Sequence, residues 1–412
     1  MGIRIEKVSR ALLILVTMLL MLAGLFTSRI LLSVSMEVFI LLTCVHNSFL
    51  QQFKAFCRNP FLLGMSCLFL IPLISGVHEQ DMSQWAAILR IKLPLLLLPL
   101  AFAGSWQLNK RQWSLLSFVF LFFAFAACSF SLWQYAAHMQ DLNKSYLQAK
   151  VIPTSLENDH VRFSWLISFA AMLALYMIRN EQKTLVRILM ALLTVFFTVY
   201  LHILSARTGL VSLYIFLLLL VAEMIMKKRN RKWAFAICAL VMIMPLGAWF
   251  SMPTFRNRVH YFNYDYSFVQ QNAYLPGSND GTRINSFRAG WDIMKQHPLG
   301  VGAGDVMRKA SEWYDVHVPA ILPSDKILPG NEWLVYGDAA GWIGFIAFTI
   351  IMILPFTQRA EKDKIFWFAL CISSALSLLF DIGLEVQFGV FCYAFFLLWW
   401  WKRESKIISS LS

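Results

Sequence analysis

Charged residues are scarce in this 412-residue chain: Asp, Glu, Lys and Arg make up 14% of it, against 58% for hydrophobic residues. A typical soluble domain carries about 25% charged residues, so these few could not cover a soluble surface of this size. The apolar residues fall instead in blocks of about 16–25, the length that crosses the hydrocarbon core of a bilayer. This scarcity of charge predicts an all-α, polytopic membrane protein.

Acidic residues are scarcer than basic ones, 23 against 36, which gives a net charge of +13. The excess is not spread evenly, because 21 of the 36 basic residues lie at the two termini and in the connections 46–60, 104–112, 179–187, 227–232 and 357–364. The short connections between these hold few basic residues. By the positive-inside rule both termini are cytoplasmic. The excess therefore reflects topology, and we expect no nucleic-acid partner.

Paired cysteines, metal-ligand spacings and phosphate-binding glycine loops are missing. The seven cysteines (44, 57, 67, 128, 238, 371 and 392) lie in apolar blocks or in the 46–60 connection. None falls in the long outward connection, so no disulfide framework is expected there. Because no nucleotide-binding glycine loop is present either, we predict neither a bound metal nor a cofactor.

The apolar blocks divide the chain into three parts. About twelve spans are predicted, at roughly 11–27, 30–45, 61–77, 84–103, 113–137, 162–178, 188–204, 208–225, 233–251, 336–356, 365–380 and 387–401. Residues 1–251 then hold nine transmembrane helices, residues 252–335 form one large outward loop, and residues 336–412 hold three more helices and a cytoplasmic tail.

The outward loop is structured and basic. In "RINSFRAGWDIMKQHPLG" the apolar residues Ile284, Phe287, Trp291 and Met294 recur every three or four positions, which predicts a short amphipathic helix. A second helix is predicted at "DVMRKASEWYDV". The loop carries eight basic residues: Arg256, Arg258, Arg283, Arg288, Lys295, Arg308, Lys309 and Lys326. A cationic loop above a membrane protein indicates an anionic ligand at the membrane surface.

Three further cations lie at or inside the spans. In "HILSARTGLVSLYIFLLLL", Arg207 sits between two apolar runs, where it either snorkels to the headgroups or binds an anion. Arg90 and Lys92 lie well inside a predicted span, where a charge costs roughly 2.5–3.5 kcal/mol unless paired or hydrated. Their partner is either an acidic side chain such as Glu37 or the phosphates of a ligand. A diphosphate suits arginine, whose planar fork donates two parallel hydrogen bonds.

The elements "SARTG", "GTRINSFRAGWDIMKQHPLGVGAGD" and "LPGNEWLVYGDAAGWIGF" resemble the O-antigen ligase family, which includes O-antigen polymerases and O-oligosaccharyltransferases. The resemblance covers about residues 160–380. It implies a metal-independent, inverting glycosyltransferase of the GT-C-like membrane type in the bacterial inner membrane. Such an enzyme takes a glycan from undecaprenyl diphosphate at the periplasmic face and gives it to an acceptor, here most simply lipid A-core.

The resemblance also implies roles for individual residues. Arg207 matches the family arginine at the span boundary, and Arg283 matches the loop arginine fifteen residues before the proline of "PLGVG". Both would bind the diphosphate and stabilise the leaving group. Arg288 is either a third donor or part of a solvated face. Arg90, Lys92, Asn331 and His317 are the remaining candidates for substrate binding.

The chain departs from the family pattern at one catalytic position. The family usually has "HN" before the span that follows the loop, with the histidine acting as base toward the acceptor hydroxyl, whereas this chain has Gly330-Asn331. Three interpretations are open. Glu332, Asp305 or His317 supplies the base, the reaction depends chiefly on leaving-group stabilisation, or the chain is an inactivated version. If the missing histidine disables the chain, Gly330→His is expected to raise glycan transfer.

Two other functions compete with ligation. A polysaccharide polymerase would use the same arginine clamp with a second lipid-linked glycan as acceptor. A transporter of lipid-linked sugars would be expected to show internal repeats and functional loops on both faces. Because the chain has one large loop and no evident repeat, we favour the enzyme.

Overall fold

The computed structural model describes residues 2–76, 80–148, 150–155, 159–227, 231–271, 273–358 and 364–404, with side chains from residue 10 onward. Within these ranges every regular element is helical. The helices that coincide with the predicted spans are α1 (Gly2–Thr27), α2 (Arg29–Cys44), α4 (Pro60–Ser75), α5 (Met82–Phe102), α6 (Lys110–Ala137), α8 (His160–Asn180), α9 (Thr184–Leu204), α10 (Arg207–Met226), α11 (Arg231–Ser251), α15 (Glu332–Ile353), α16 (Lys364–Phe380) and α17 (Gln387–Glu404). The others are α3 (Phe49–Arg58), α7 (Met139–Ser145), α12 (Pro253–Gln270), α13 (Asp280–Gln296), α14 (Val306–His317) and the short 3-10 helices η2 (Tyr146–Gln148), η3 (Pro323–Asp325), η4 (Leu354–Thr357) and η5 (Gly383–Glu385). The all-helical, polytopic class is thereby confirmed.

The helices differ in how well they suit a membrane span. Among the described residues, eight are long and apolar enough to cross a bilayer, and the pair α2 and α3, bent by 104°, would make a ninth. Helices α4 and α16 are apolar but shorter, with 16 and 17 residues. The number twelve, the GT-C-like assignment and the three-part division of the chain stay predictions.

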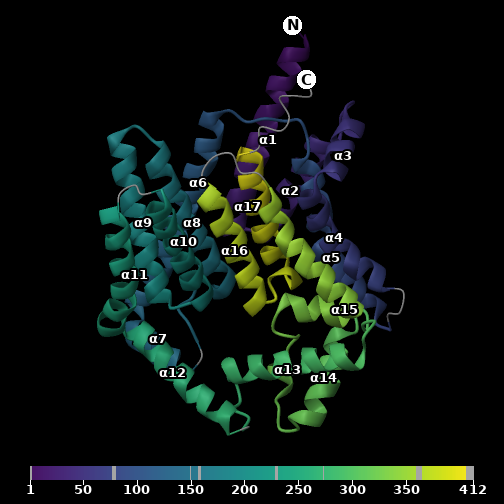
Figure 1. The fold of residues 1–412 in the computed structure, drawn as a ribbon, viewed down its shortest axis with the longest axis vertical. Coiled ribbons are helices and arrows are strands. Elements are labelled where there is room, and N and C mark those ends of the chain that lie inside the picture. Colours follow the sequence, from purple (N-terminus) through teal and green to yellow (C-terminus); the bar gives the residue numbers. More distant parts are fainter. Residues whose placement is uncertain are drawn as a thin grey trace.

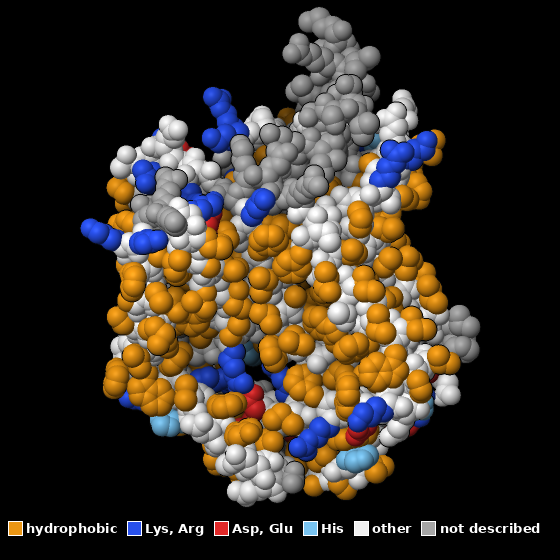
Figure 2. All heavy atoms as spheres, in the orientation of Figure 1, with side chains coloured by type: hydrophobic (Ala, Val, Ile, Leu, Met, Phe, Trp, Pro, Cys, Tyr) orange, Lys and Arg blue, Asp and Glu red, His pale blue; other side chains and the backbone are white. Residues whose placement is uncertain are grey.

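The two ends of the bundle carry different parts of the chain. Helix α1 begins and α17 ends at one end, while the loop helices α12, α13 and α14 lie at the other (Figure 1). Hydrophobic side chains cover the middle of the molecule, and Lys and Arg side chains gather toward its two ends (Figure 2). This is the arrangement expected when residues 252–335 and the termini face opposite sides of a membrane. Which side is periplasmic stays a prediction from the distribution of basic residues.

Helices α8 and α17 form the interior of the bundle. Buried residues make up 83% of the span window of α8, and residues 389–402 of α17 are all buried. The ring of Phe169 in α8 packs against Phe396 and Trp399 of α17, with ring centroids 4.8 and 6.1 Å apart. By contrast, only 11% of the α11 window is buried, so α11 presents most of its apolar surface to lipid.

Short polar residues fix where several spans begin. The Asn59 side chain accepts hydrogen bonds from the first backbone N–H groups of α4, and Asp81 does the same for α5. At the start of α6, Asn109 and Gln112 form a capping box, in which each side chain bonds the other residue's backbone. These caps satisfy N–H groups that the first turn of a helix leaves without partners.

The loop is anchored by a turn that fits into a break in α15. Gly341 has a φ of 68°, so the helix is interrupted there and some of its backbone groups are free to bond the "HPLGVG" turn. The Trp342 N–H donates to the Pro298 carbonyl at 3.1 Å, and the Val301 N–H donates to the Asp338 carbonyl at 2.7 Å. A Cβ atom on Gly341 would lie 2.0 Å from the Pro298 oxygen. Only glycine fits this close approach, which explains why the motif combines "PLG" with a glycine in the next span.

Candidate active site

A pocket of about 410 Å³ opens between α10, α12, α13 and α16, where the bundle meets the loop. We call it the arginine pocket, because Arg207 and Arg283 both line it. Asp280 is its one acidic lining residue, and its apolar walls include Val211, Phe262, Ile284, Phe287, Leu376 and Phe380. Figure 2 shows a hollow with Lys or Arg side chains at its edge near the loop end of the molecule. The two arginines predicted to act together are thus brought to one cavity.

Arg207 is the first residue of α10, so its position at the boundary of the span is fixed by the helix start. Its Nη2 donates to Oδ2 of Asp280 at 2.6 Å, and the guanidinium lies 5.0 Å from the ring centre of Phe262. The side chain is nevertheless 49% exposed. One edge of the guanidinium is therefore paired while the group as a whole still faces the pocket.

The start of α13 is held by a carboxylate from α12. The buried Asp265 accepts hydrogen bonds from the backbone N–H groups of Asn279, Asp280 and Gly281, at 3.1, 2.8 and 3.3 Å. A carboxylate at a helix N-terminus satisfies the free N–H groups and complements the helix dipole. This cap fixes the first turn of α13, which carries Asp280, and Arg283 follows three residues later.

Arg283 is half-buried beside the other charges of the pocket. Burial lowers its pKa from the ordinary value, the nearby Asp381 raises it, and the positive charge of Arg207 lowers it further. The described residues provide its guanidinium with no hydrogen bond and no ion pair. Arginine stays protonated at neutral pH, so Arg283 presents a desolvated positive charge for which the best partner is an anion.

A family comparison agrees with this geometry. The model of the family described as O-Antigen ligase matches residues 192–349, from within α9 to within α15. This part of the chain is similar to the O-antigen ligase family. The match supports glycosyl transfer of the ligase or polymerase type in general, a reaction that joins a lipid-linked glycan to a glycan acceptor. No curated protein matches the chain in a sequence search.

Gly330, which stands where the O-antigen ligase family usually has histidine, packs against α13. A Cβ atom there would lie 2.6 Å from Oγ of Ser286, 3.0 Å from the ring of Phe287 and 3.2 Å from Cγ of Arg283. The position is therefore adjacent to Arg283, as a catalytic role requires, but a side chain there would crowd its neighbours as they now stand. The gain expected from Gly330→His therefore needs the side chains of Ser286, Phe287 and Arg283 to shift first.

Glu332 is not open to the arginine pocket. Its side chain is fully buried, Oε1 accepts from the Leu384 N–H, and Oε2 has no hydrogen-bond partner. Beside it, Lys92 forms a buried ion pair with Glu385. Lys92 also lies 4.2 Å from the ring centre of Tyr336. These groups form a charged cluster inside the protein, so Glu332 would have to become accessible before it could take a proton from an acceptor.

The partner of Lys92 is an acidic side chain, as one of the two predicted alternatives had it, but it is Glu385 and not Glu37. Lys92 pairs with Glu385, and neither Glu37 nor a ligand phosphate is needed to balance its charge. Arg90 and Glu37 are exposed on the surface of the bundle, whereas Lys92 is 2% exposed. Arg90 and Lys92 thus point to different environments, because two positions along a helix correspond to about 200° of rotation. Neither lines the arginine pocket.

Other predicted site residues also lie outside the arginine pocket. Asn331 is the N-cap of α15, where its side chain accepts from the Leu334 N–H at 2.8 Å. Arg288 and His317 are exposed and line a second pocket, on a different face of α13. Asp305 is buried and accepts hydrogen bonds from the Gln80 N–H and from Arg308. In this conformation none of the three candidate bases, Glu332, Asp305 and His317, lines the arginine pocket.

Arg258 is a cation that motif matching alone did not single out. It lies near Arg207 and Asp280, and its Nε and Nη1 atoms are buried without hydrogen-bond partners. Burial lowers its pKa from the ordinary value, and the charge of Arg207 lowers it further. The only sequence signal was the basic character of the loop. Arg258 adds positive potential behind Arg207 without lining the pocket itself.

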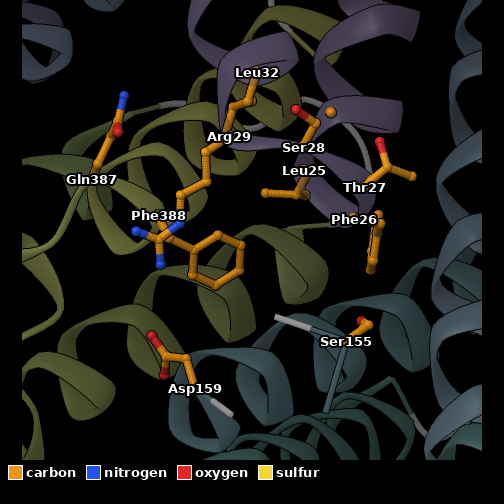
Figure 3. Close-up of a pocket in the computed structure, with 11 residues that line it drawn as sticks. Leu25, Phe26, Thr27, Ser28, Arg29, Leu32, Ser155, Asp159, Gln387 and Phe388 are labelled. Atoms are coloured by element: carbon orange, nitrogen blue, oxygen red, sulfur yellow. The ribbon is translucent and has the colours of Figure 1, made fainter. Parts of the chain in front are cut away.

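A small pocket of about 160 Å³ lies between the turn joining α1 to α2 and the starts of α8 and α17. Figure 3 shows Arg29 and Asp159 directed into it, beside the ring of Phe388. Asp159 pairs with Arg162 at 2.6 Å, and Arg162 pairs with Asp381 at 3.2 Å. This chain of charges reaches the surroundings of Arg283, to whose electrostatic environment Asp381 contributes most among the charged groups.

Metal ligands are not grouped in the described ranges: no three or more His, Cys, Asp or Glu side chains there are arranged to hold an ion. The positive charge next to the pocket is supplied by guanidinium groups instead. Their chemistry suits the binding of phosphate oxygens, because arginine donates in a planar fork and keeps its charge.

Proposed function

We propose that this protein transfers a glycan from undecaprenyl diphosphate to lipid A-core, at the periplasmic face of the bacterial inner membrane. The observation that supports it most is that Arg207 and Arg283 line one pocket at the boundary between the spans and the loop. A lipid diphosphate needs a cationic site beside an apolar surface. The arginine pocket offers both, since Val211, Leu376 and Phe380 lie among its walls.

In the proposed step the acceptor hydroxyl oxygen attacks the anomeric carbon, and the bond from that carbon to the phosphate oxygen breaks. The electron pair leaves with undecaprenyl diphosphate, and attack from the opposite side inverts the anomeric configuration. Arg207 and Arg283 stabilise the charge that develops on the leaving oxygen. Removing one such preorganised donor typically costs on the order of 10²–10³-fold in turnover.

The proton of the acceptor hydroxyl needs a separate account. Gly330 cannot accept it, and Glu332 is buried in this conformation. We therefore propose that leaving-group stabilisation carries most of the catalysis and that the proton passes to water. Since the arginines supply the positive charge that a divalent metal would otherwise provide, the reaction is proposed to be metal-independent.

The test uses purified full-length protein, undecaprenyl diphosphate carrying an isotope-labelled glycan, and lipid A-core. Ligation moves the label onto lipid A-core, and the transfer should survive EDTA. Polymerisation would give longer lipid-linked glycans even without lipid A-core. Movement of labelled donor across a vesicle bilayer without any new glycosidic bond would identify a transporter, and a requirement for added magnesium or manganese would refute the metal-free account.

A further inference from the structure

A second pocket, of about 590 Å³, lies between α13 and the end of α14, and we call it the loop pocket. This volume falls within the range of roughly 300–1,000 Å³ typical of small-molecule sites. Its lining includes Asn285, Arg288, Trp291 and Asp292 of α13, with Trp313 and His317 of α14. It is therefore large enough for a ligand and combines aromatic rings with planar polar groups.

The polar groups of the loop pocket are available. In the described parts of the chain, no hydrogen bond or ion pair engages the side chains of Asn285 or Arg288. His317 stacks on Trp313, with ring centroids 4.3 Å apart, and its Nδ1 atom bonds the Trp313 carbonyl, which leaves Nε2 as the unused ring nitrogen. Asn285 offers both donors and an acceptor, and Arg288 offers a fork of donors. This set suits a ligand rich in hydroxyl groups.

The loop pocket also has an open aromatic surface. Trp291 is 41% exposed, although its ring also packs edge-on against Trp342. The apolar C–H face of a sugar ring packs well on such a surface, while its hydroxyls reach neighbouring polar side chains. The Trp313 indole N–H donates to Asp292 at 3.1 Å, which holds the wall between the two helices in place.

The loop pocket and the arginine pocket meet at the first turn of α13. Asp280 lines the arginine pocket, and its neighbour Gly281 lines the loop pocket. A Cβ atom on Gly281 would lie 2.5 Å from Oγ of Ser278 and 3.2 Å from Oδ1 of Asp265, so the boundary between the two pockets is closely packed at this glycine. Because adjacent residues of α13 line the two pockets, a glycan attached to a phosphate between Arg207 and Arg283 would begin close to the loop pocket.

We infer that the loop pocket binds sugar units of the donor glycan, beyond the one attached to the diphosphate. This inference rests on the proposed function, because it places the glycan relative to the diphosphate site. It also gives Arg288 a different role from the predicted third diphosphate donor. Arg288 contacts the hydroxyl groups of the glycan, and Arg207 and Arg283 contact the phosphates.

The test compares two lipids on purified full-length protein: undecaprenyl diphosphate alone, and undecaprenyl diphosphate carrying a glycan of several sugars. Arg288→Gln and Asn285→Ala should each weaken binding of the glycan-bearing lipid roughly tenfold, the effect of one lost hydrogen bond to a charged or polar group. Binding of the bare lipid should change less than twofold. Arg256→Gln removes an exposed arginine of α12 that lines neither pocket, and it is the matched control.

The same oligosaccharide without lipid separates the two proposals. It should compete with the glycan-bearing lipid for the parent protein and lose this ability in Arg288→Gln. The inference is wrong if Arg288→Gln and Asn285→Ala weaken both lipids equally, or weaken neither. Failure of the proposed function looks different: Arg207→Lys and Arg283→Lys would then leave label transfer to the acceptor unchanged, whatever the oligosaccharide does.

Discussion

Arg207 and Asp280 form an ion pair of 2.6 Å that joins the first turn of a membrane helix, α10, to the first turn of a loop helix, α13. The Arg207 side chain is 49% exposed, so solvent screens the pair and its own contribution to stability is small. Its importance lies in position. It holds one edge of the guanidinium against the protein and leaves the rest of the group to an incoming anion.

Replacing Arg207 by lysine separates an anchor from an anion clamp. Lysine keeps the charge and snorkels as well as arginine, but it lacks the planar fork. We expect turnover to fall on the order of 10²–10³-fold while folding and membrane insertion are unchanged. Label transfer to the acceptor measures turnover, and Arg256→Lys is the control. A folded Arg207→Lys protein with full activity would reduce this residue to a membrane anchor.

Arg283→Lys should cause a similar loss, because the two guanidinium groups line the same pocket. If both stabilise one leaving group, their contributions are not independent. The double variant should therefore lose less than the product of the two single losses. A double loss equal to the full product would show that the arginines act on separate steps or separate ligands.

The orientation of the loop can be measured with a thiol reagent that does not cross membranes. Ser324 is exposed in η3, in the 252–335 loop, so Ser324→Cys should react in intact spheroplasts. The native Cys57 is exposed in α3, toward the opposite end of the molecule, and should react only after lysis. Replacing the exposed Cys238 by serine removes background. The reverse pattern of labelling would place the arginine pocket on the cytoplasmic side and refute periplasmic transfer.

The helices at the predicted spans could be predicted from sequence, because run length is a local property. The joint role of Arg207 and Arg283 was implied by the resemblance of their motifs to the O-antigen ligase family, and both residues line one pocket. The partner of Lys92 could not be predicted, since Glu385 lies 293 positions away. The side of α13 on which Arg288 lies could have been predicted from its spacing to Arg283. Five positions after Arg283 correspond to about 140° around a helix, which turns Arg288 away from the arginine pocket.

Lys92 was predicted to bind substrate, and the buried pair with Glu385 suggests a structural role. Lys92→Met leaves a buried carboxylate without its partner, which typically costs about 3–5 kcal/mol. We expect a clear fall in melting temperature in detergent, and partial recovery in Lys92→Met with Glu385→Gln. If that double variant is stable but no longer binds undecaprenyl diphosphate, Lys92 contacts the substrate after all.

The missing histidine gives the last prediction. Gly330→Ala should lower the melting temperature and transfer together, because the new Cβ meets Ser286 at 2.6 Å and Arg283 at 3.2 Å. Ser286→Ala removes the closest atom, so the two substitutions combined should be less harmful than the sum of their separate effects. Gly330→His is then tested in the Ser286→Ala background, where the side chain has more room. If an absent general base limits this chain, transfer should rise there, up to the 10²–10⁴-fold typical of such assistance. A well-folded Gly330→His, Ser286→Ala protein with no gain would show that leaving-group stabilisation by the arginines suffices.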